Sequence, residues 1–126
     1  MIKILVLDDE KGAGEQLVDF FAYRGYKVFN TIGGEQAILM LKKENPDILL
    51  LDIKMAGPDG LDVLRAAKEF NPEVRAIMIT ALKDADKKRQ AKELGADEYI
   101  VKPFSYEELE SLMIRVVNEI ISERGD

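Results

Sequence analysis

Five polar residues follow apolar segments of the sequence, at points where buried strands would end. They are Asp8, Asp9, Asp52, Thr80 and Lys102. If the segments form one parallel sheet, its carboxyl edge brings together three carboxylates, a hydroxyl and an ammonium group. Carboxylates held this close repel one another, which favours either protonation or a bound cation. Because the chain has no histidine and no cysteine, oxygen ligands indicate Mg²⁺, with Mn²⁺ also possible.

The chemistry that such a site supports is phosphoryl transfer to a carboxylate. A carboxylate can attack phosphorus and form an acyl phosphate if a metal ion and an ammonium group neutralise the transferring group. Asp52 has the central position for this role. Lys102 would pair with a phosphoryl oxygen, and the Thr80 hydroxyl would donate a hydrogen bond to it. Ala81 is small and leaves room beside the incoming group.

The same residues, taken one at a time, have simpler structural interpretations. The acidic triplet 8–10 could stabilise a helix N-terminus through the helix dipole. Asp52 could be a cap or loop residue, Thr80 could end a strand, and Lys102 could be a surface charge. Their joint placement at one edge of one sheet favours the functional interpretation.

The elements that must position these residues are short strands alternating with helices. Apolar runs of the kind covered on both faces of a sheet occur at Ile2 to Leu7, Lys27 to Asn30, Ile48 to Leu51, Ala76 to Ile79 and Tyr99 to Val101. Helical spacing occupies residues 17–24, 37–41, 61–70, 84–94 and 105–121. The stretch 84–94 is the most polar and should be the least buried helix, while Ser105 and Glu108 form a predicted capping box.

Five βα units in 126 residues predict one α/β domain over residues 1–126. The expected architecture is a doubly wound, five-stranded parallel sheet in the order 2-1-3-4-5, with five helices on its two faces. In such a sheet the ligand site lies beyond the carboxyl ends of the strands, near the switch point between the first and third.

Composition excludes several classes of function. The net charge of −6 opposes direct binding of nucleic acid, which requires a basic surface. No segment approaches the roughly 20 apolar residues of a membrane span, so no membrane insertion is expected. The absence of cysteine favours a cytoplasmic protein, and the absence of histidine means that any phosphohistidine donor belongs to another protein.

Five motifs carry a resemblance to a known family. They are LVLDDE at 5–10, ILLLDIKM at 48–55, DG at 59–60, MITA at 78–81 and LGADEYIVKPF at 94–104. Together they make the chain resemble, over essentially its whole length, the response-regulator receiver domains of two-component systems, which have a CheY-like, flavodoxin-like fold. The resemblance implies a phosphorylation-dependent signalling switch rather than an enzyme.

The resemblance also implies roles for individual residues. Asp52 would be the phosphoacceptor. Asp9, Asp52 and the backbone carbonyl of Lys54 would bind Mg²⁺ directly, and Asp8 would act mainly through water.

A second group of residues would respond to the phosphoryl group. Thr80 and Lys102 would contact it, and the Lys102–Pro103 peptide would be cis. Thr80 and Tyr99 would form the switch pair, which changes the surface built from the fourth helix, fifth strand and fifth helix.

Partners follow from the same resemblance. A histidine kinase or histidine phosphotransfer domain would donate the phosphoryl group and dock near the first helix. The signal would pass to a downstream protein or to an appended output domain, and the sequence does not separate these two cases. Two other classes stay open: an aspartate-nucleophile phosphatase, which needs a second acid where Lys54 stands, and a flavin-binding module, which needs a phosphate-binding loop after Leu7.

The chain departs from the family pattern beside the acceptor. The usual Met-Pro pair is Met55-Ala56, and the proline is displaced to Pro58, which predicts a freer or differently bent loop. Lys54 could overhang the phosphoryl group, and Leu82 offers no polar atom to orient an attacking water. These residues predict slow self-dephosphorylation.

Overall fold

The computed structural model describes residues 1–10, 12–55 and 57–125. Over these ranges it contains five parallel strands in the spatial order β2-β1-β3-β4-β5. The strands are β1 (Lys3–Leu7), β2 (Lys27–Thr31), β3 (Ile48–Leu51), β4 (Arg75–Thr80) and β5 (Glu98–Val101). The predicted sheet and strand order are therefore confirmed.

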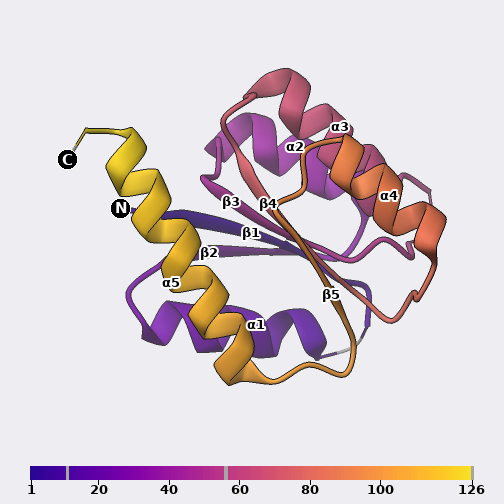
Figure 1. Cartoon of the computed structure of the whole chain (residues 1–126), viewed down its shortest axis with the longest axis horizontal. Helices are drawn as coiled ribbons and strands as arrows, with labels where there is room; N and C mark the ends of the chain where they lie inside the picture. The colour runs from indigo at the N-terminus through magenta and orange to yellow at the C-terminus, as the bar shows by residue number, and fades with distance from the viewer. Residues whose placement is uncertain (11, 56, 126) are drawn as a thin grey trace.

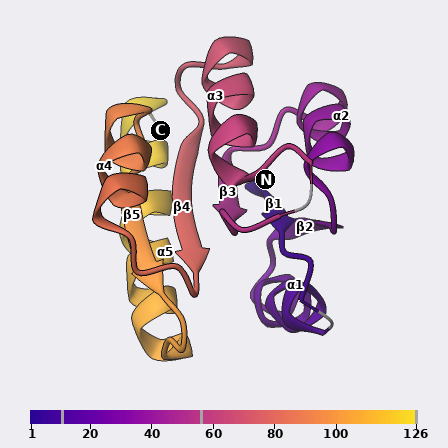
Figure 2. The same cartoon turned by 90° about the vertical axis from the view of Figure 1, so that its right-hand side faces the viewer.

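The first four helices connect successive strands, the fifth follows β5, and together they cover both faces of the sheet (Figures 1 and 2). They are α1 (Ala13–Tyr23), α2 (Gly34–Glu44), α3 (Gly60–Phe70), α4 (Ala85–Glu93) and α5 (Tyr106–Glu123). Helices α1 and α5 pack on one face, and α2, α3 and α4 pack on the other. In the part of the chain that the structure describes, no helix is long and apolar enough to span a membrane.

The central strands are apolar throughout because each residue must enter one of two cores. In β1, Leu5 and Leu7 point toward α2 and α3, whereas Ile4 and Val6 point toward α1 and α5. All four side chains are buried. Burying each contributes about 1.5–3 kcal/mol relative to an exposed position, so the two cores fix the register that brings the strand ends together.

The predictions about the burial of α4 and about the start of α5 agree in part with the structure. Helix α4 buries only Ala91 of its described residues, as expected for the most polar helix. The Ser105 hydroxyl accepts a hydrogen bond from the Glu108 amide, which is the serine half of the predicted capping box. A full capping box, formed by Asp59 and Asp62, begins α3.

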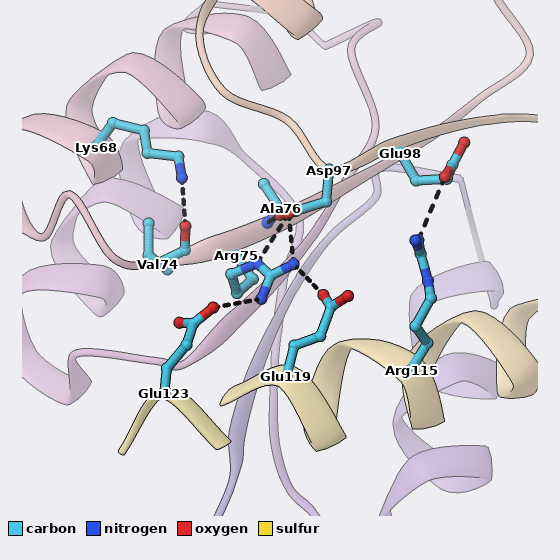
Figure 3. A network of polar contacts seen from close by, with 9 residues as sticks. All are labelled: Lys68, Val74, Arg75, Ala76, Asp97, Glu98, Arg115, Glu119 and Glu123. Carbon is cyan, nitrogen blue, oxygen red and sulfur yellow. Dashed lines mark hydrogen bonds and ion pairs between the residues drawn. The ribbon is translucent and has the colours of Figure 1, made fainter. Parts of the chain in front are cut away.

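The opposite end of the sheet, which we term the amino edge, is fastened by an ion-pair network around Arg75 at the start of β4 (Figure 3). Its guanidinium donates to Asp97 at 2.8 Å and to Glu119 at 2.6 Å, and Glu123 lies 3.5 Å away. The hydrogen bond with Asp97 raises the pKa of Arg75 and outweighs the effect of burial. Because Glu119 and Glu123 belong to α5, this network holds the C-terminal half of that helix against the sheet.

Candidate functional site

The predicted polar residues meet at the other end of the sheet, which we term the carboxyl edge. Asp8 and Asp9 follow β1, Asp52 follows β3, Thr80 ends β4 and Lys102 follows β5. Carboxylate oxygens of the three aspartates lie within 4.8 Å of one another. Asp8 and Asp52 are buried while Asp9 is exposed, so the cluster is anchored inside the protein and open on one side.

Backbone amides orient the two buried carboxylates. The Glu10 amide donates to Asp8 Oδ1 at 2.9 Å, and the Lys54 amide donates to Asp52 Oδ1 at 3.1 Å. Three converging carboxylates in an all-oxygen donor set fit a hard divalent cation such as Mg²⁺. The family's use of Mg²⁺ at an acidic site is consistent with this cluster. Ligation by the Lys54 carbonyl stays a prediction.

Lys102 lies between the buried aspartates. Its Nζ is 2.6 Å from Asp8 Oδ2 and 3.3 Å from Asp52 Oδ2. Burial alone would lower the pKa of Lys102, but the hydrogen bond and charge of Asp8, together with the charge of Asp52, raise it overall. The ammonium therefore stays charged at neutral pH and offsets part of the negative charge of the cluster.

Glu10 is a member of this cluster that sequence reasoning did not assign. Its Oε2 lies 3.2 Å from Lys102 Nζ, although most of the Glu10 side chain is exposed. The signal was present in the acidic triplet, since a third acid in the same loop can reach the lysine that its neighbours contact. Its presence adds a further negative charge and favours cation binding.

Thr80 and Tyr99 contact the same loop residue. The buried Thr80 hydroxyl accepts a hydrogen bond from the Leu82 amide at 3.3 Å, and the half-buried Tyr99 hydroxyl donates to the Leu82 carbonyl at 2.6 Å. Burial raises the pKa of Tyr99, and the charges of Asp84 and Asp52 add to this effect. The phenol is thus a neutral donor that ties β5 to the loop between β4 and α4.

The helix after the acceptor begins directly against it. A Cβ atom on Gly60 would lie 2.2 Å from the Asp52 carbonyl oxygen, so this approach requires glycine. The Lys102–Pro103 peptide is cis, as predicted. Ala56, which belongs to the predicted departure in this loop, lies outside the described residues.

A hollow of about 440 Å³ opens beside Lys102, between α1 and the segment that leads into α5. Its lining includes Asp8 and Ala81 from the carboxyl edge and Gln16 from α1. Ala81 is exposed, in agreement with the room expected there. The cluster is therefore accessible from the side on which α1 lies.

Comparisons with known proteins agree with this geometry. The family model described as "Response regulator receiver domain" matches residues 4–114. The sporulation initiation phosphotransferase F of Bacillus subtilis (strain 168) is 38% identical over 107 residues, which cover 85% of this chain and 86% of that protein. The probable transcriptional regulator ycf27 of Porphyridium aerugineum is 39% identical over 118 residues, covering 94% of this chain and 49% of that protein. The chain thus spans about half the length of that regulator.

Solved structures of receiver domains have the same fold as this chain. The BeF3-activated DrrB receiver domain superposes with a TM-score of 0.85 at 29% identity, covering 94% of this chain and 98% of that one. The non-phosphorylated HemR receiver domain from Leptospira biflexa superposes with a TM-score of 0.86 at 26% identity, covering 93% and 94%. Similarity therefore extends over nearly the whole of both domains.

Proposed function

This chain belongs to the response regulator receiver domain family, and we propose that its Asp52 is the residue that accepts the phosphoryl group. Membership of the family makes the chain a phosphorylation-dependent signalling switch. The observation that carries the assignment to Asp52 is its buried carboxylate, which lies beside two other aspartates and 3.3 Å from Lys102. The domain assists its own phosphorylation and does not turn over a separate substrate.

In the proposed reaction, an Asp52 carboxylate oxygen forms a bond to phosphorus while the bond from phosphorus to the donor breaks. The donor group leaves with the electron pair and takes up a proton. Lys102 neutralises a phosphoryl oxygen, and the Thr80 hydroxyl turns to donate to another. Mg²⁺ held directly by Asp9, Asp52 and the Lys54 carbonyl, and by Asp8 mainly through water, would supply further charge neutralisation.

The switch would act through Leu82. Once the Thr80 hydroxyl turns to the phosphoryl group, it no longer accepts from the Leu82 amide, and Tyr99 is released from the Leu82 carbonyl. The surface formed by α4, β5 and α5 then changes. Phosphorylation stabilises this second arrangement because only that arrangement makes the new contacts.

The proposed partners are a histidine kinase or histidine phosphotransfer domain and a downstream recipient, in a cytoplasmic setting. A donor outside this domain is supported by the lack of histidine among its residues and by the hollow beside α1. Relatives named as transcriptional regulators are about twice as long, which supports an appended output domain as one form of recipient. A separate downstream protein is the other.

The direct test is the mass of the intact protein after incubation with acetyl phosphate and Mg²⁺. We expect the mass of one phosphoryl group to be gained by the unmodified protein and not by Asp52→Ala. No gain in the unmodified protein would refute the proposal.

Slow loss of the phosphoryl group is a second expected property. Lys54 is exposed beside Asp52, and Leu82 is an apolar residue at a position from which an amide could orient water. Leu82→Gln should shorten the phosphoryl lifetime, measured by mass after removal of acetyl phosphate. An unchanged lifetime would show that Leu82 does not limit hydrolysis.

A further inference from the structure

Gly34, the first residue of α2, lies against the loop that follows Asp52. A Cβ atom at Gly34 would be 2.0 Å from the Pro58 carbonyl oxygen and 2.7 Å from its carbonyl carbon. Both atoms are backbone, so no side-chain rotation would relieve the contact. The proline ring also fixes φ and limits how Pro58 can adjust. A larger residue at position 34 would therefore move the loop.

A short segment, residues 58–60, connects the contact between Gly34 and Pro58 to Asp52. Asp59, next to Pro58, exchanges hydrogen bonds with Asp62 at 2.9 and 3.0 Å. The Gly60 amide donates to the Ile53 carbonyl at 3.2 Å, while Gly60 itself lies against the Asp52 carbonyl. Residues 58–60 thus bridge α2 and the backbone of the acceptor.

Electrostatics favours the same arrangement. The N-cap residue Gly33 makes no side-chain capping bond, as a glycine cannot. The Pro58 carbonyl oxygen lies at the N-terminal end of α2, where the positive end of the helix dipole attracts a partial negative charge. Helix α2 therefore holds the loop by both shape and charge, although none of its residues was assigned to the site.

We propose that Gly34 is a positioning residue for the phosphoryl-acceptor loop. By admitting the Pro58 carbonyl to α2, it fixes how residues 52–55 present the Asp52 carboxylate and the Lys54 backbone to a divalent cation. The role rests on the proposed function of Asp52. The contact with Gly34 also explains how this loop is held although its proline stands at position 58 and not directly after Met55.

The test compares Gly34→Ala with Gly33→Ala. A Cβ at Gly33 meets no described atom within 4 Å, and its φ of −142° suits any residue, so Gly33→Ala is a matched control. Mg²⁺ affinity is measured by titration of the amide resonances of Lys54 and Met55, and phosphorylation rate by intact mass. We expect Gly34→Ala to weaken Mg²⁺ binding roughly tenfold, the lower end for loss of support around a metal site, with slower phosphorylation. Gly33→Ala should leave both unchanged.

A structural role alone would lower thermal stability without changing the Mg²⁺ affinity of the folded protein. Metal-free spectra add a readout independent of activity: the Lys54 and Met55 amides should shift in Gly34→Ala only. If Gly34→Ala does not fold, Pro58→Gly is measured in its place, because it frees the loop without adding an atom. This variant should also weaken Mg²⁺ binding. Pro72→Gly, at the far end of α3, is its control.

The outcomes separate the two proposals. Equal Mg²⁺ affinity in the unmodified protein and in Gly34→Ala, or in Pro58→Gly where that variant decides, overturns the role of Gly34. An unmodified protein that binds Mg²⁺ but gains no phosphoryl group overturns the proposed function of Asp52.

Discussion

The two edges of the sheet each hold one largely buried cation against three carboxylates. Lys102 does so at the carboxyl edge, and Arg75 does so at the amino edge (Figure 3). The two side chains are almost equally exposed, at 14% and 15%. The number of charged groups therefore does not distinguish the two edges.

The difference lies in the carboxylates. At the carboxyl edge two of the three, Asp8 and Asp52, have side chains only 3% and 10% exposed, and Glu10 is 67% exposed. At the amino edge only Asp97 is largely buried, at 19% exposed, while Glu119 and Glu123 are 43% and 63% exposed and are screened by water. Buried carboxylates that converge on one point favour a bound cation, whereas solvated ones form ordinary ion pairs. Burial of the acidic partners, and not their number, separates a binding site from a structural fastening.

Replacing the cationic side chain at each edge should give the largest difference between the two edges. Lys102→Met is expected to slow phosphorylation by acetyl phosphate roughly a hundredfold, because it removes a positive charge aimed at the transferring group. Arg75→Met should leave the rate unchanged. Initial rates from intact mass provide the measurement, and similar losses in both variants would contradict the division of roles.

A smaller effect concerns stability. Arg75→Met should lower the free energy of unfolding by about 2 kcal/mol, as expected for charged hydrogen bonds in a partly buried setting, measured by urea denaturation. Arg115→Met is the control, since its pair with Glu98 at 3.4 Å is exposed and should contribute no more than about 1 kcal/mol. Equal losses would show that the Arg75 network is no stronger than a surface pair.

The smallest expected effect is a pH dependence of stability that distinguishes Lys68 from Lys102. Burial lowers the pKa of Lys68, near the amino edge, below its ordinary 10.5; the charge of Asp97 opposes this effect and the charge of Arg75 adds to it. The pKa of Lys102 is raised instead. At neutral pH Lys68 is charged in both states, so the folded state carries the full cost of burial. As pH rises through the lowered pKa toward 10.5, the folded protein loses this proton first and the cost is relieved.

The free energy of unfolding should therefore rise relative to that of Lys68→Met across this alkaline window. Urea denaturation of both proteins at a series of pH values measures the difference, and groups common to both cancel. A difference that stays flat or falls would show that burial does not control this lysine.

Much of the site could be predicted because it depends on strand ends. Apolar runs covered on both faces define the strands, and parallel strands deliver the residues after them to one edge. Asp8, Asp9, Asp52 and Lys102 needed no further information. Thr80 was found for the same reason, as the last residue of β4.

The rest depends on contacts that have no periodic pattern. Glu10 reaches Lys102 because of the course of a loop, and Arg75 meets Glu119 only after α5 is packed. Gly34 has no side chain to suggest a role, and its importance appears only as the proximity of another backbone. Local sequence predicts which residues end a strand, but not which backbones touch across the fold.

Helix α5 connects the two edges. It begins close behind Lys102 and Pro103, runs for 18 residues, and is fastened near its end through Glu119 and Glu123. At 1.5 Å per residue it is about 27 Å long. Its first turns are held as well, because Leu109 and Met113 are buried and Glu110 pairs with Arg24 of α1, so a shift of Pro103 would move α5 as one rigid rod along the sheet. The Arg75 network at the far end of α5 would then receive a displacement made beside Lys102, which gives the two edges a mechanical connection through one helix.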